Sequence, residues 1–163
     1  NYDGSVTDII FPNKDTDGNI VTEIGTGAFN MNTNITSIVT LNTLTLINNA
    51  AFSKCSSLKK ATFSNGLQTI STSFTETQLE ELVIPDSVET IYIAAFANVT
   101  TLKTLYLGSG VTTLGMFAFQ YSPTADTNDE NSNIVLTVYN KSTLDLEQMK
   151  NNVFNNRTKI IFK

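Results

Sequence analysis

Histidine and tryptophan are absent from the 163 residues, and cysteine occurs once. The lack of histidine removes the commonest general base, the serine–histidine and cysteine–histidine nucleophile systems, and most zinc sites. A single cysteine excludes an internal disulfide framework and does not indicate the redox compartment. Catalysis would have to depend on carboxylates alone, so we expect no enzyme activity, no cofactor and no bound metal ion.

Positive charge and long apolar runs are also scarce. The chain has 10 Lys and Arg against 15 Asp and Glu, a net charge of −5 and no run of basic residues, which argues against nucleic acids and anionic membrane surfaces as partners. No segment approaches the roughly 18 consecutive apolar residues of a membrane span. The hydrophobic content of 40% is enough for one core, so residues 1–163 are expected to form a single domain.

Phenylalanine, by contrast, recurs at a fixed interval of 22 or 23 residues, and alanine precedes it in all cases but one. A period of this size is typical of a stacked solenoid. It predicts five full repeats of 21–23 residues after a partial N-terminal unit. The repeated phenylalanines are Phe29, Phe52, Phe74, Phe96 and Phe119.

Aliphatic residues keep the same register in each unit. One opens the unit, another follows three places later, and an L-x-x-L-x-L pattern follows the phenylalanine, weakened only at Thr40. One unit cannot cover its own apolar face, whereas stacked units bury equivalent side chains in ladders. The alternation and the β-branched residues predict short parallel strands, with a tight turn or short helix around the phenylalanine.

Three segments depart from the repeat. The third unit is two residues short, with one residue lost on each side of Phe74. Residues 121–133 are polar and acidic without periodicity, which predicts a mobile surface loop of unassigned role. Residues 134–163 are expected to cap the solenoid with a strand, a helix whose N-cap is Ser142, and a last strand.

The segments VTEIGTGAF, AAFSKCSSLKKATF and LEELVIPDSVETI resemble the BspA-like, or Treponema-type, leucine-rich repeats of secreted and surface proteins in bacteria and some protists. The resemblance implies a right-handed α/β solenoid with a parallel β-sheet on its concave face. Short turns, helical turns and short strands would lie opposite, and a helix-strand cap would follow. It also implies an extracellular or cell-surface, adhesin-like protein, although the sequence includes no signal peptide.

The outward row of the concave sheet is the candidate binding site for an extracellular protein or glycan, since rows of this kind line the binding surface of repeat proteins. Two other roles stay open: a structural spacer within a longer surface protein, and an accessory module of a carbohydrate-active enzyme. β-Branched residues at these positions could also merely suit strands. The candidate strip consists of Lys60, Thr62, Glu81, Val83, Thr104 and Tyr106.

Two further features invite a chemical interpretation. Residues 13–20 resemble the start of a calcium loop, but Glu23 falls at position eleven where the twelfth should hold the bidentate glutamate. A turn built on Asp17 and Gly18 is the better interpretation. Cys55 lies three residues after Phe52, which favours a small buried ladder residue over a nucleophile.

Overall fold

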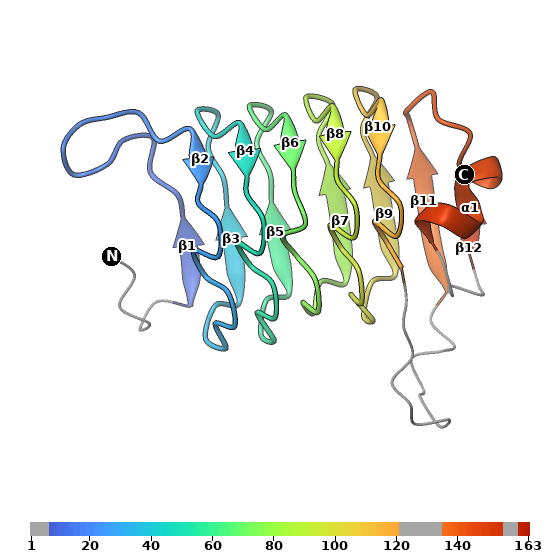
Figure 1. Cartoon of the computed structure of the whole chain (residues 1–163), viewed down its shortest axis with the longest axis horizontal. Helices are drawn as coiled ribbons and strands as arrows, with labels where there is room; N and C mark the ends of the chain where they lie inside the picture. Colours follow the sequence, from blue (N-terminus) through green and yellow to red (C-terminus); the bar gives the residue numbers. More distant parts are fainter. Residues whose placement is uncertain (1–6, 121–134, 155–159) are drawn as a thin grey trace.

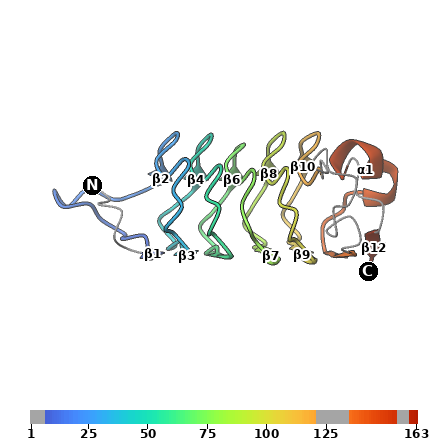
Figure 2. The same ribbon diagram turned by 90° about the horizontal axis from the view of Figure 1, so that it is seen from below.

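The chain forms a parallel-strand solenoid of about five turns with one short helix (Figure 1). The computed structural model describes residues 7–120, 135–154 and 160–163. Each turn contributes one longer strand and one two-residue strand, and the two rows run along opposite sides of the stack (Figure 2). The fold predicted from the repeat is therefore confirmed.

The longer strands form one side of the solenoid and the shorter strands the other. The longer strands are β1 (Asp8–Ile10), β3 (Ser37–Val39), β5 (Lys60–Thr62), β7 (Glu81–Ile84), β9 (Thr104–Leu107), β11 (Leu136–Asn140) and β12 (Ile160–Phe162). The shorter strands are β2 (Glu23–Ile24), β4 (Leu46–Ile47), β6 (Thr69–Ile70), β8 (Thr90–Ile91) and β10 (Thr113–Leu114). The helix α1 (Leu146–Val153) lies at the C-terminal end.

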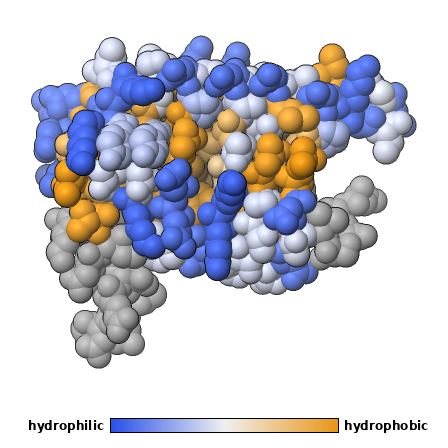
Figure 3. All heavy atoms as spheres, turned by 180° about the vertical axis from the view of Figure 1, so that it is seen from behind, coloured by the Kyte–Doolittle hydropathy of each residue, from blue (hydrophilic) through white to orange (hydrophobic). Residues whose placement is uncertain are grey.

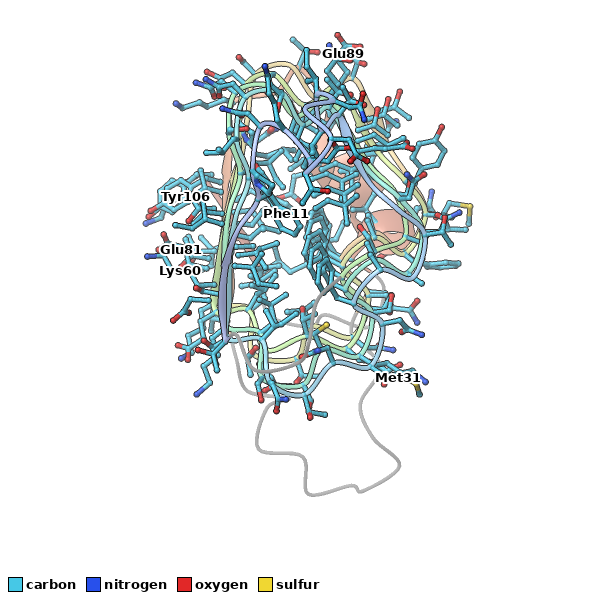
Figure 4. The ribbon with its side chains drawn as sticks, turned by 90° about the vertical axis from the view of Figure 1, so that its left-hand side faces the viewer. Phe11, Met31, Lys60, Glu81, Glu89 and Tyr106 are labelled. Carbon is cyan, nitrogen blue, oxygen red and sulfur yellow. The ribbon has the colours of Figure 1, made fainter. Side chains whose placement is uncertain are left out.

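A continuous stack of phenylalanine rings occupies the core. From Phe29 to Phe119, neighbouring rings are parallel within 14° and their centroids are 5.1–5.3 Å apart. Phe11 closes the N-terminal end edge-on, with centroids 5.8 Å from Phe29 (Figure 4). Each fully buried large side chain contributes roughly 1.5–3 kcal/mol, so the stack is a principal source of stability.

The turns around the phenylalanines contain left-handed residues at two fixed places, two residues before and two residues after the ring. Their amide groups each donate a hydrogen bond to a backbone carbonyl of the next turn. These residues are Gly27, Met31, Ala50, Lys54, Glu76, Ala94, Asn98 and Phe117.

A break in hydrogen bonding separates β5 from β7. The short strands form one continuous sheet in the order β2-β4-β6-β8-β10, but the long strands divide into β1-β3-β5 and β7-β9-β11-β12. β5 and β7 still lie side by side. The two residues missing from the third unit flank Phe74, between β6 and β7. The break between β5 and β7 thus coincides with the shortened unit, while β6 keeps its pairing with β4 and β8.

The C-terminal helix imitates a further repeat. Phe154, just after α1, stacks on Phe119 with centroids 5.5 Å apart, and the amide of Phe119 donates to the carbonyl of Val153 at 3.0 Å. The predicted N-cap is wrong: the Asp145 side chain accepts from the amide of Gln148 at 3.1 Å. Ser142 instead forms a local turn in which its hydroxyl donates to Asn140 Oδ1 at 2.7 Å.

Candidate functional site

The predicted strip lies on the outward face of the long-strand sheet. Lys60, Glu81 and Tyr106 point away from the core (Figure 4). In the strand register Val83 pairs with Tyr106, and their side chains are 49% and 37% exposed. Thr104, paired with Glu81, is half-buried. The structure thus places these side chains outward, while ligand binding by them stays a prediction.

The break between β5 and β7 divides the strip. Lys60 and Thr62 lie on β5, and the other four residues lie on β7 and β9. A groove of about 450 Å³ follows the break and is lined on one side by Lys60 and Thr62, and on the other by Glu81 and Val83. The six residues therefore form two rigid parts separated by a groove rather than one unbroken ladder.

A second groove of about 470 Å³ lies over β7, β9 and β11. Glu81, Val83 and Tyr106 belong to the predicted strip, but Asp86, Tyr139 and Lys141 were not expected there. A signal for Tyr139 exists in the sequence, because the Thr-Val-Tyr of β11 repeats the Thr-Leu-Tyr of β9. The remaining lining residues are Phe63, Asn65, Ile84, Pro85, Leu107 and Gly108.

Two tyrosine rings stack across neighbouring strands at one wall of this groove. Tyr106 and Tyr139 have centroids 4.6 Å apart and planes inclined by 10°. The ammonium group of Lys163 lies 5.6 Å from the centroid of the Tyr139 ring, within the range of a cation–π interaction. The pair is thus held in a fixed orientation by its neighbours.

Carboxylates near the strip are fixed by hydrogen bonds. Asp86 accepts a hydrogen bond from the amide of Ser109 at 2.8 Å, and this bond lowers the pKa of its carboxyl. Glu80, beside the strip, accepts from Lys103 Nζ at 2.9 Å, which lowers its pKa in the same way. Both groups are exposed, and the ion pair of Glu80 with Lys103 contributes little to stability. Their significance is a fixed negative charge at the surface.

Apolar side chains continue beyond the strip on the same sheet. The space-filling view from behind shows hydrophobic side chains across the middle of this face, with hydrophilic side chains above and below (Figure 3). Ile10 on β1 is 69% exposed and Ile161 on β12 is 47% exposed. Exposed apolar surface rimmed by polar groups is typical of an interaction site.

The calcium-like segment forms a turn. Asp15 Oδ1 accepts from the amides of Asp17 and Asn19 at 2.9 and 2.8 Å, and its Oδ2 accepts from the Asn19 side chain. Gly18 adopts a φ of 84°, as a turn at this position requires. Within residues 7–120, 135–154 and 160–163 no three His, Cys, Asp or Glu side chains gather as metal ligands.

Cys55 is fully buried, and its thiol donates to the carbonyl of Phe29 at 3.1 Å. Burial raises the pKa of this thiol to about 11, so the thiol stays protonated at neutral pH. A protonated buried thiol is a poor nucleophile. The interpretation of Cys55 as a ladder residue is confirmed.

Two other expectations from the sequence concern the loop at 121–133 and the absence of a membrane span. The predicted loop at 121–133 lies outside the described residues. Among the helices of the described part of the chain, none has the length and apolar character needed to cross a membrane.

Comparison with known proteins identifies the repeat. A family model described as the BspA type leucine rich repeat region, in six copies, matches residues 2–73 and 22–161. The search of curated proteins gave no match. Such repeats form a protein-interaction scaffold.

Solved structures with this fold come from several bacteria. The T. pallidum leucine rich repeat protein TpLRR has a TM-score of 0.66 at 21% identity, covering 83% of this chain and 59% of that one. The pneumococcal vaccine antigen PcpA has a TM-score of 0.66 at 20% identity, covering 97% and 42%. A leucine rich cell surface protein of Faecalibacterium prausnitzii has a TM-score of 0.68 at 21% identity, covering 92% and 35%. The chain thus spans between about a third and three fifths of these proteins.

Proposed function

Because the chain belongs to the BspA-type leucine-rich repeat family, we propose that it acts outside the cell as an adhesin-like scaffold that binds a protein of a host or neighbouring cell. The strip of Lys60, Thr62, Glu81, Val83, Thr104 and Tyr106 carries the contact. A cell-surface location is supported by the similarity to the leucine rich cell surface protein of F. prausnitzii.

One observation carries the proposal: exposed apolar and aromatic side chains lie in register on neighbouring strands of a rigid sheet. Val83 and Tyr106 are directly paired, and Tyr106 stacks on Tyr139. Side chains already held in place lose little entropy on binding. Tyrosine is also enriched among the residues that dominate binding energy at protein interfaces. A protein ligand can therefore gain affinity here at low ordering cost.

The test is a binding screen against immobilised extracellular-matrix proteins, cell-surface proteins and glycans, with wild type and two pairs of variants. Tyr106→Ala and Val83→Ser alter the strip. Tyr92→Ala and Ile93→Ser are the matched controls, because these side chains are each 51% exposed and follow the short strand β8 on the other side. We expect the strip variants to weaken binding of a protein hit roughly fivefold or more, and the controls to leave it unchanged.

Other outcomes separate the remaining roles. A hit that is lost in the control variants, or in substitutions within 121–133, would place the contact elsewhere and contradict the proposal. Glycan hits without protein hits would favour an accessory module of a carbohydrate-active enzyme. The absence of any specific hit would favour a spacer within a longer protein, a role compatible with the partial coverage of the neighbours.

A further inference from the structure

We propose that the groove beside Tyr106 binds a cationic side chain of the protein ligand, with arginine preferred over lysine. The inference rests on the proposed function, because it names the chemistry that the partner of the strip presents. Three features of the groove carry it: an open aromatic face, a cation already bound at the other end of the same ring stack, and carboxylates in the lining.

The open face belongs to Tyr106. One side of its ring lies against Tyr139, with planes inclined by only 10°. The opposite side is directed along the sheet toward β7, where the paired residue is Val83. Valine is much shorter than tyrosine, so the side chains form a step, and the groove of about 470 Å³ is lined by both of them. The face of the Tyr106 ring is therefore left uncovered on this side, next to the apolar side chain of Val83.

One outer face of this tyrosine stack already makes a cation–π contact within the chain. Lys163 places its ammonium group 5.6 Å from the ring centroid of Tyr139, on the end of the pair away from Tyr106. Two stacked rings present two outer faces, and both carry the negative potential of an aromatic quadrupole. One outer face is occupied by a cation of the same molecule. A cation from a ligand on Tyr106 would complete the symmetrical arrangement.

The charged residues of the groove favour the same ligand. Glu81 and Asp86 line it with two carboxylates, against the single ammonium group of Lys141. The Asp86 carboxylate is held by the amide of Ser109 at 2.8 Å, so a fixed negative charge is available without reorganisation. The net charge of the whole chain, −5, adds long-range attraction for basic segments.

Arginine suits the groove better than lysine. A guanidinium group is planar and weakly hydrated, so it can stack flat on an aromatic ring while its edge donates hydrogen bonds to a carboxylate. An ammonium group is compact and strongly hydrated, and it cannot cover the ring in this way. A neutral sugar could stack on Tyr106 as well and donate hydrogen bonds to the carboxylates, but it would lack the Coulomb attraction that a cation has for them.

The experiment is a titration of the isotope-labelled chain, followed by amide NMR at low salt, with three capped tripeptides. Each has two glycines around a central arginine, lysine or citrulline; citrulline has nearly the shape of arginine without its charge. We expect saturable shifts at the amides of Glu81, Val83, Tyr106 and Gly108. The arginine peptide should bind most tightly, then lysine, with citrulline weakest.

Variants tie the signal to the groove. Tyr106→Ala should weaken the arginine peptide roughly threefold or more, whereas Tyr106→Phe should retain most of the binding, because phenylalanine keeps the aromatic face. Tyr92→Ala is the matched control and should leave binding unchanged, since Tyr92 lies outside the groove. Glu81→Gln should weaken arginine binding and leave citrulline binding unaltered. Amide spectra that keep the wild-type pattern elsewhere establish that each variant is folded.

The outcomes distinguish this inference from the function on which it rests. Equal binding of the arginine and citrulline peptides, or binding of a neutral oligosaccharide at the same amides with no effect of arginine, would overturn the cationic ligand. Shifts that map away from the groove would overturn it as well. If the binding screen still yields protein hits that depend on Tyr106, the proposed function survives the loss of the cation site.

Discussion

Phe154 lies on Phe119 with planes inclined by 16°, in the same geometry by which one repeat stacks on the next. The helix α1 thus ends where a sixth phenylalanine is required. Solenoid ends expose an apolar cross-section that must be covered. Here it is covered by continuing the stack, with the carbonyl of Val153 in the place of the next turn.

Removing a ring from the middle of the stack should destabilise the whole chain. Phe52→Ala and Phe96→Ala should each lower the free energy of unfolding by roughly 3–5 kcal/mol, because both side chains are fully buried and leave a cavity. Denaturant unfolding followed by circular dichroism measures the change. Ile93→Ala, at a half-exposed position, should cost much less. Unfolding midpoints near wild type for both phenylalanine variants would contradict the role of the stack.

Two glycines at equivalent repeat positions should respond differently to alanine. A Cβ at Gly115 would overlap the backbone of Tyr92 and Ile93 in the preceding turn, whereas a Cβ at Gly25 would meet no atom within 4 Å. Gly115→Ala should therefore lower the melting temperature by several degrees, as a loss of roughly 1–2 kcal/mol would. Gly25→Ala should leave it nearly unchanged. Equal effects of the two substitutions on the melting temperature would show that the close approach of Gly115 to the backbone of Ile93 does not require glycine.

The left-handed turns predict that glycine is tolerated at some exposed positions and harmful at others. Met31 has a φ of 61° and is 62% exposed, while Met116 is 52% exposed and does not have a positive φ. Relief of strain at Met31 offsets the roughly 0.5–1 kcal/mol entropic cost of glycine, and no such relief exists at Met116. Met31→Gly should thus melt at a higher temperature than Met116→Gly. The reverse order would contradict the argument.

Acid should weaken the fold through its hydrogen-bonded carboxylates. The pKa values of Asp86 and Glu80 are lowered in the folded chain, by the amide of Ser109 and by Lys103 respectively. A lowered folded pKa contributes stability above the unfolded pKa, and that stability is lost as the pH falls through the folded pKa. Urea midpoints should therefore be constant above about pH 5 and decline below about pH 4. Asp86→Asn combined with Glu80→Gln should reduce this decline in part, since the pKa values of Asp8 and Asp15 are lowered as well, and an unchanged slope would contradict the assignment.

Repetition made much of the fold predictable, because a position that recurs in five units reveals its environment several times. The phenylalanines and the outward row that includes Val83 and Tyr106 were found in this way. Even the departure at Thr40 has a local solution, since its buried hydroxyl accepts a hydrogen bond from the amide of Ser64 at 2.9 Å. The repeat can therefore hold a polar residue at this core position, and the alignment of the units remains correct.

Features that occur once were not predictable from the period. The sequence around Phe74 shows that the third unit is short. It does not show which of the two rows of strands loses its pairing, because that depends on how the neighbouring units pack. Tyr139 was not predicted as a site residue, because it follows the 121–133 segment and so does not occupy a position in the five aligned repeats. The N-cap was assigned to Ser142 because serine is a good cap, whereas Asn140 engages its hydroxyl and leaves Asp145 to begin the helix.

The hydrogen-bonding break between β5 and β7 gives the molecule an uneven response to force. The other neighbouring full repeats are joined by strand pairs on both sides, but the second and third are paired as strands only through β4 and β6, with further backbone hydrogen bonds in the turns around Phe52 and Phe74. If the solenoid is pulled from its two ends, we expect it to open along this line before it opens between repeats that are paired on both sides. The opening would widen the groove between Lys60 and Glu81, so that tension would act on the surface proposed for binding.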